Sequence, residues 1–284
     1  MPLSTDTTNA TNVAETTQRL LVDLFPGAKD ETLRRLFSLT DRIFTGQHHD
    51  FQAVDLKYHD YRHTLQVTVC TTDLLAGHLA NAEPKPALTP RHFELSVAAA
   101  LMHDTGYLKS PADHVGTGAK YTYCHVLRSC AIAASYLPAC GFNLVEIDVV
   151  LGAIRRTSPA PAGTVPRYRN IEDHFIACVV ASSDYLAQMA AEDYPDELGI
   201  LYDEFTESDD FIGTPAANRV FKSAADLALR TPKFWEKGVK PKLEKDFGGV
   251  CHLIDEPDGA NTYIDAIEQN LAIITQRTAA AAVG

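Results

Sequence analysis

The chain has 284 residues, of which 45% are apolar and 22% charged, a composition typical of a globular protein with a sizeable core. No apolar run approaches the roughly 18–20 residues that cross a bilayer, and the Thr- and Asn-rich start, Met1 to Thr17, lacks the pattern of a secretory signal, so we expect a cytoplasmic protein that binds no membrane. A formal net charge of −12 disfavours binding to nucleic acid, and an anionic substrate would need a local positive charge such as a divalent cation.

Apolar residues recur with helical spacing in the first third of the chain, and strand-like alternation is scarce. The first helix is predicted from Glu15 to Phe25 and the second from Asp30 to Phe44. The third is predicted from Tyr61 towards Ala80. Pro90 then suits the first turn of a fourth helix that ends near Asp104.

The same periodicity continues in the rest of the chain, with two segments rich in Gly, Pro and Asp between the helices. These segments, 158–169 and 194–213, are predicted as loops over a site. We expect one all-α domain, a helical bundle over residues 15–278, with a disordered tail at 1–14 and a frayed end at 279–284. The further helices are predicted at Tyr121–Leu137, Asn143–Arg156, Ile171–Met189, Thr214–Leu229 and Asn261–Arg277.

The six cysteines form no CxxC pair and no ladder of short spacings. This pattern disfavours a disulfide framework and a structural zinc knuckle. Most of them stand in apolar stretches, so we expect reduced core residues.

Side chains that commonly bind metals recur at three places along the predicted helices. The segment Tyr58-His59-Asp60-Tyr61-Arg62-His63 opens the third helix, and His103-Asp104 closes the fourth. Asp184 stands midway along a helix that is otherwise apolar. Imidazole and carboxylate groups together suit divalent cations such as Zn, Fe, Mn and Mg. Burying an unpaired carboxylate is costly, so a metal ion is a natural partner for Asp184.

The dipeptide His-Asp alone is weak evidence, because the chain holds three copies: His49-Asp50, His59-Asp60 and His103-Asp104. Only the last follows a strongly apolar run, Val97 to Met102, and is soon followed by a glycine, Gly106. The specific signal is the ordered set. Two histidines stand four apart, the His-Asp pair comes forty residues after the second, and the isolated aspartate comes eighty residues later.

With this ordered set the chain resembles the HD-domain metal-dependent phosphohydrolase superfamily, whose ligands follow the pattern H…HD…D, over roughly Asp55 to Met189. The segment from Tyr58 to His63 is similar to the YHNxxH segment of the class I cyclic-nucleotide phosphodiesterases. Asp60 stands where those enzymes have Asn, and Thr105-Gly106-Tyr107 replaces their Asp-His continuation after the HD pair. The resemblance implies an HD-domain/PDEase-like helical bundle.

The resemblance also implies roles for individual residues. His63, His103, Asp104 and Asp184 would hold a first divalent metal, and Asp104 would also touch a second. His59 would donate a proton to the leaving oxygen. General chemistry agrees, because two cations about 3.5–4 Å apart lower the pKa of a bridging water and screen phosphoryl oxygens. A histidine that titrates near neutrality can supply the proton.

Four other side chains keep two interpretations each. His125 is either a ligand of a second metal or a structural residue that caps a helix. Arg155 and Arg156 either clamp a phosphate at the pocket rim or form a solvated helix end. Tyr185 belongs either to the wall of a substrate pocket or to the core.

We therefore predict a hydrolase that uses one or two divalent metals to cleave a phosphate ester or diester of a small nucleotide-like molecule. A cyclic-nucleotide phosphodiesterase is its sharper form, and hydrolysis of a mononucleotide or nucleoside triphosphate is an alternative. A di-iron HD-domain oxygenase is a rival that gains weight if His125 and either His114 or His174 bind metal. A second rival is a nucleotide-binding regulatory module without turnover. The sequence leaves a homo-oligomer open.

Overall fold

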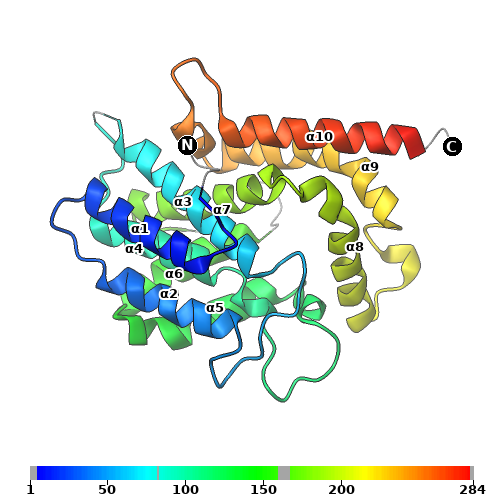
Figure 1. The fold of residues 1–284 in the computed structure, drawn as a ribbon, viewed down its shortest axis with the longest axis horizontal. Helices are drawn as coiled ribbons and strands as arrows, with labels where there is room; N and C mark the ends of the chain where they lie inside the picture. The colour runs from blue at the N-terminus through cyan, green and yellow to red at the C-terminus, as the bar shows by residue number, and fades with distance from the viewer. Residues whose placement is uncertain (1–4, 82, 159–166, 282–284) are drawn as a thin grey trace.

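The computed structural model describes residues 5–81, 83–158 and 167–281 (Figure 1). Every regular element in these ranges is a helix or a helical turn, which confirms the predicted all-α fold class. None of the helices in these ranges is both long and apolar enough to cross a membrane. The longer helices are α1 (Ala10–Leu24), α2 (Glu31–Phe44), α3 (Tyr61–Leu79), α4 (Pro90–Met102), α5 (His125–Tyr136), α6 (Leu144–Thr157), α7 (Ile171–Ala190), α8 (Tyr194–Phe211), α9 (Ala224–Phe234) and α10 (Thr262–Ala281).

Polar caps decide where several helices begin. Helix α1 starts at Ala10, five residues before the predicted Glu15, because the Asn9 side chain accepts hydrogen bonds from the backbone N–H groups of Thr11 and Asn12. Residues 10–14, which the sequence placed in a disordered tail, are therefore helical. Helix α4 opens as predicted with Pro90 in its first turn.

Helix α8 takes up residues 194–211 of the segment 194–213, so the prediction of this segment as a loop was wrong. Buried residues recur at helical spacing along it, at Tyr194, Leu198 and Leu201. Pro195, Asp196 and Gly199 stand between them, and this content of Gly, Pro and Asp suggested a loop. Pro195 occupies the first turn, where a missing N–H costs nothing.

Two other segments differ in part from their predictions. The helix predicted over Thr214–Leu229 is the short turn η5 (Ala216–Asn218) followed by α9, which begins after Ser223 because the Ser223 hydroxyl accepts a hydrogen bond from Asp226 N–H. The loop predicted at 158–169 lies mostly outside the described residues. Four of the six cysteines are buried as expected, whereas Cys130 is half-buried and Cys124 is exposed.

Helix α7 lies at the centre of the bundle and packs against α3, α4, α6 and α10 (Figure 1). Buried residues occupy every side of α7, and one continuous hydrophobic core joins it to its neighbours. Helices α9 and α10 lie side by side, and α8 contacts both of them. The ends of α3 and α4 and the middle of α7 are thus brought together inside the fold.

A buried carboxylate on α3 gives this fold a testable pH dependence. Tyr263 of α10 donates a hydrogen bond of 2.8 Å to Asp73. Burial raises the pKa of Asp73 to about 6, and the Tyr263 hydrogen bond offsets only part of that rise. Because the folded pKa lies above the unfolded value, this carboxyl group stabilises the fold least when it is ionised. Stability is expected to fall as the pH rises from about 4 towards about 6.

Replacing Asp73 by asparagine keeps a hydrogen-bond acceptor and removes the charge. The free energy of unfolding at pH 8 is expected to rise by about 3 kcal/mol, since the pKa is raised by about two units and each unit corresponds to about 1.4 kcal/mol. The gain should shrink at pH 4.5. Urea denaturation at the two pH values measures it. Asp203→Asn, at an exposed site on α8, is the matched control and should change little. A loss of stability at both pH values for Asp73→Asn would contradict the prediction.

Candidate functional site

Local structure positions each of the four predicted metal ligands. The Asp60 carboxylate accepts a hydrogen bond of 2.8 Å from His63 N–H, which places His63 in the first turn of α3. His103 directly follows α4, and Asp104 precedes the short turn η2 (Thr105–Tyr107). Asp184 lies within α7.

These four side chains converge on one small volume. His63 Nε2 lies 3.5 Å from Asp104 Oδ2 and 3.4 Å from Asp184 Oδ1. His103 Nε2 lies 3.3 Å and 3.7 Å from the same two oxygens. Two imidazole nitrogens and two carboxylate oxygens thus face one another, although they come from positions spread over residues 63–184.

The donor set fits a divalent cation, because two of its imidazole nitrogens have no hydrogen-bond partner among the described residues. His103 Nδ1 lies 2.7 Å from the carbonyl of Ala100 and donates to it, so Nε2 is the nitrogen that faces the carboxylates. The Nε2 atoms of His63 and His103 are buried and find no hydrogen-bond partner in the described part of the chain. A buried polar atom without a partner destabilises the fold. A cation bound between these two nitrogens and the carboxylates that they face would give both nitrogens a partner.

The carboxylates around His103 favour positive charge at its Nε2 atom, which either a proton or a metal cation can supply. Burial alone lowers the pKa of His103, but Asp104, Asp184 and the Ala100 carbonyl together more than compensate, and the pKa rises to about 9. Burial alone raises the pKa of Asp104, but His103 and the other nearby imidazoles hold it well below its usual range. Asp104 is therefore an ionised carboxylate, the form that binds a cation.

His125 joins the cluster from a different side. Its Nδ1 donates to the Thr122 carbonyl at 2.7 Å, and its Nε2 lies 3.5 Å from Asp104 Oδ1, the oxygen that does not face His63 and His103. Of the two interpretations of His125, the ligand-like position is thus the one that the geometry favours. The two oxygens of Asp104 face two different sets of imidazoles, as a carboxylate shared by two cations would.

The Thr105-Gly106-Tyr107 segment supports this arrangement. The Tyr107 ring is stacked between His59 and His125, with centroid distances of 4.7 Å and 4.4 Å. Gly106 lets the start of α5 approach closely, because a Cβ there would lie 1.9 Å from the carbonyl oxygen of His125. A larger residue at position 106 would displace His125 and the stacked rings.

Glu204 is a site residue that the sequence analysis missed. His59 Nδ1 donates to Glu204 Oε2 at 2.7 Å, and Glu204 Oε1 accepts from the backbone N–H groups of Tyr58 and Lys57 at 2.9 and 3.2 Å. Burial lowers the pKa of His59, but the hydrogen bond and charge of Glu204 raise it overall. Glu204 belongs to α8, which the sequence analysis took for a loop, so no pattern pointed to it.

A cavity of about 1310 Å³ opens beside the cluster. His59, Asp104, His125 and Asp184 all line it, as do two of the predicted substrate-binding residues, Arg155 and Tyr185. Arg156 is not among the lining residues. It is buried, and its guanidinium donates to the carbonyl of Asp246.

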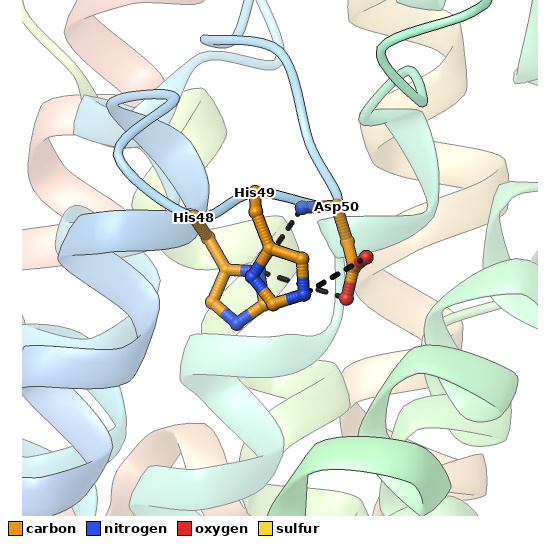
Figure 2. A group of neighbouring side chains, drawn as sticks. All are labelled: His48, His49 and Asp50. Atoms are coloured by element: carbon orange, nitrogen blue, oxygen red, sulfur yellow. Dashed lines mark hydrogen bonds and ion pairs between the residues drawn. The ribbon is translucent and has the colours of Figure 1, made fainter.

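Two further groups of ligand-type side chains occur among the described residues, and neither shares the cavity. In the loop after α2, the stacked rings of His48 and His49 lie beside the Asp50 carboxylate (Figure 2). The Asp50 carboxylate also accepts a hydrogen bond from Tyr136. The other group is Glu244, Cys251 and His252, in which His252 already bonds to two carboxylates.

Comparison of the chain with models of protein families, with curated proteins and with solved structures finds no match. The function therefore has to be argued from the site.

Proposed function

We propose that this protein is a metal-dependent phosphohydrolase of the HD-domain type. The observation that carries the proposal is the convergence of two unpartnered buried imidazole nitrogens, on His63 and His103, with carboxylate oxygens of Asp104 and Asp184. These four residues would hold one cation, and His125 with the second oxygen of Asp104 would help to hold another. When bound, such cations lower the pKa of a water and screen the charge of phosphoryl oxygens.

Hydrolysis adds the hydroxyl group of water to phosphorus and breaks the ester P–O bond, so the leaving oxygen needs a proton. We assign the donation of this proton to His59. Its Nδ1–H is held by Glu204 at 2.7 Å, while the ring lines the cavity next to Asp104. The Nε2 atom therefore remains to hold the transferable proton. Glu204 positions the ring and favours its protonated form.

A di-iron oxygenase is the second candidate, favoured by the position of His125 beside Asp104. This hypothesis also expects His114 or His174 to bind metal. His114 is exposed, and His174 lies against Cys178 and Tyr168, so neither belongs to the cluster. The hydrolase is therefore the better-supported proposal.

Metal analysis and product release test the proposal together. Protein purified without added metal should contain one or two equivalents of a divalent metal per chain. That protein should release product from at least one of three substrate classes: cyclic nucleotides, mononucleotides and nucleoside triphosphates. A chelator should remove the activity and lower the melting temperature. Absence of product from all three with metal-loaded protein would defeat the proposal, and an oxygen-dependent colour change of an iron-containing sample would favour the oxygenase.

A further inference from the structure

The cavity beside the candidate metal site is larger than a small phosphoester needs. Its volume of about 1310 Å³ exceeds the roughly 300–1000 Å³ of typical small-molecule sites. The reacting phosphoryl group would fill only the end formed by His59, Asp104 and Asp184. Helices α7, α8 and α9 supply much of the remaining wall. The chemistry of their side chains indicates what the part of the substrate that does not react looks like.

Aromatic and apolar side chains form much of the cavity lining. Tyr185 directly follows Asp184, and its ring centroid lies 6.4 Å from that of Phe234 on α9. Phe205 and Phe221 also line the cavity and pack against each other with centroids 5.5 Å apart. The buried Leu227 is a further apolar lining residue. Such walls favour a flat or apolar group over a hydrated one.

Three basic side chains lie near these aromatic residues in the chain, on α9 and on the π-helical turn η6 (Trp235–Val239). Arg230, Lys233 and Lys237 all line the cavity. Arg230 pairs with Asp226 at 2.8 Å. Lys233 and Lys237 stand four residues apart and so share a helix face, and neither has an ion-pair partner in the part of the chain that the structure describes.

The cavity reverses the charge balance of the chain. Acidic residues outnumber basic ones by 37 to 25 in the whole sequence. Apart from Asp104 and Asp184, the one carboxylate among the described lining residues is Asp209, and it accepts a hydrogen bond from Tyr123. Four basic side chains line the same cavity, the three of α9 and η6 and Arg155. In a protein this acidic, a local excess of positive charge indicates a binding site for an anion.

From this arrangement, and resting on the proposed function, we propose that the substrate is a phosphoester with a second anionic group. A flat or apolar segment separates the two groups. The phosphoester lies at the imidazole–carboxylate cluster, the apolar segment lies between Tyr185 and Phe221, and the second anion lies at Lys233 and Lys237. Phosphates and carboxylates are both suitable second anions, because an ammonium group acts as a point charge.

Equilibrium binding to manganese-loaded protein tests the second anion without any turnover. Phenylphosphonate and 4-carboxyphenylphosphonate form a matched pair of probes. Both carry a phosphonate whose C–P bond is not hydrolysed, and only the second carries a carboxylate on the far side of the flat ring. The carboxylated probe is expected to bind at least about tenfold more tightly, a difference of about 1.4 kcal/mol. The double variant Lys233→Ala/Lys237→Ala should lose that preference and keep its affinity for phenylphosphonate. Lys245→Ala, at an exposed position on the turn η7 (Lys242–Asp246), is the matched control and should keep the preference.

Turnover separates this inference from the function on which it rests. Phenyl phosphate and 4-carboxyphenyl phosphate, the ester counterparts of the two probes, report cleavage by the release of inorganic phosphate. Cleavage of both compounds with equal affinity for the two binding probes would overturn the inference and leave the phosphohydrolase standing. Tighter binding of 4-carboxyphenylphosphonate without any cleavage of the two esters would support the two-anion site and count against the hydrolase. An equal loss of affinity for both probes in the double variant would show general attraction of anions and would overturn the inference.

Discussion

Replacing His103 by alanine is expected to abolish metal retention and turnover together. His103 Nε2 is one of the two unpartnered nitrogens that face Asp104 and Asp184, and no other described side chain stands ready to replace it. Loss of a residue that merely supports a ligand already weakens metal binding by about 10–100-fold, so loss of a ligand should do more. Elemental analysis and the product assay measure the two effects, and the variant should also lose the thermal stabilisation by metal.

His78→Ala is the matched control for this experiment. His78 is also a buried histidine, and its Nε2 bonds to the carbonyl of Pro86 at 2.8 Å. Its removal should lower the free energy of unfolding, because it deletes a buried side chain and leaves a carbonyl unpaired. It should leave metal content unchanged. If His103→Ala retains as much metal as His78→Ala, the cluster is not the metal site.

Replacing His59 by asparagine is expected to separate metal binding from catalysis. His59 lines the cavity but is not among the atoms that converge between His63 and His103. The variant should therefore retain its metal while kcat falls by about 100- to 10,000-fold, the usual contribution of a general acid. Steady-state kinetics with a metal-loaded sample measure this.

Two variants sharpen the assignment of His59. Glu204→Gln keeps the size of the positioning residue and removes its charge, so it should lower kcat by less than His59→Asn and shift the pH dependence of kcat. His114→Asn changes an exposed histidine of a loop and should leave the rate unaltered. An unchanged kcat in His59→Asn would remove this residue from the role of proton donor.

Short-range patterns predicted the helices well where their causes are local. The start of α3 depends on Asp60, which accepts a hydrogen bond from the backbone N–H of His63, three residues away. The start of α1 was misplaced because Asn9 was read as part of a polar tail rather than as a cap. Helix α8 was missed because the Gly, Pro and Asp content of its segment was given more weight than the periodic apolar positions Tyr194, Leu198 and Leu201.

The sequence by itself determined the helical fold class and the candidate ligands His63, His103, Asp104 and Asp184, because periodicity, caps and residue chemistry are properties of neighbouring residues. Only the tertiary structure decided that these four side chains meet, and that Glu204 holds His59 from 145 positions away. It also decided that Lys233 and Lys237 share a cavity with the cluster. Such meetings depend on how α8 and α9 pack against the core, and no pattern within a few residues encodes that packing.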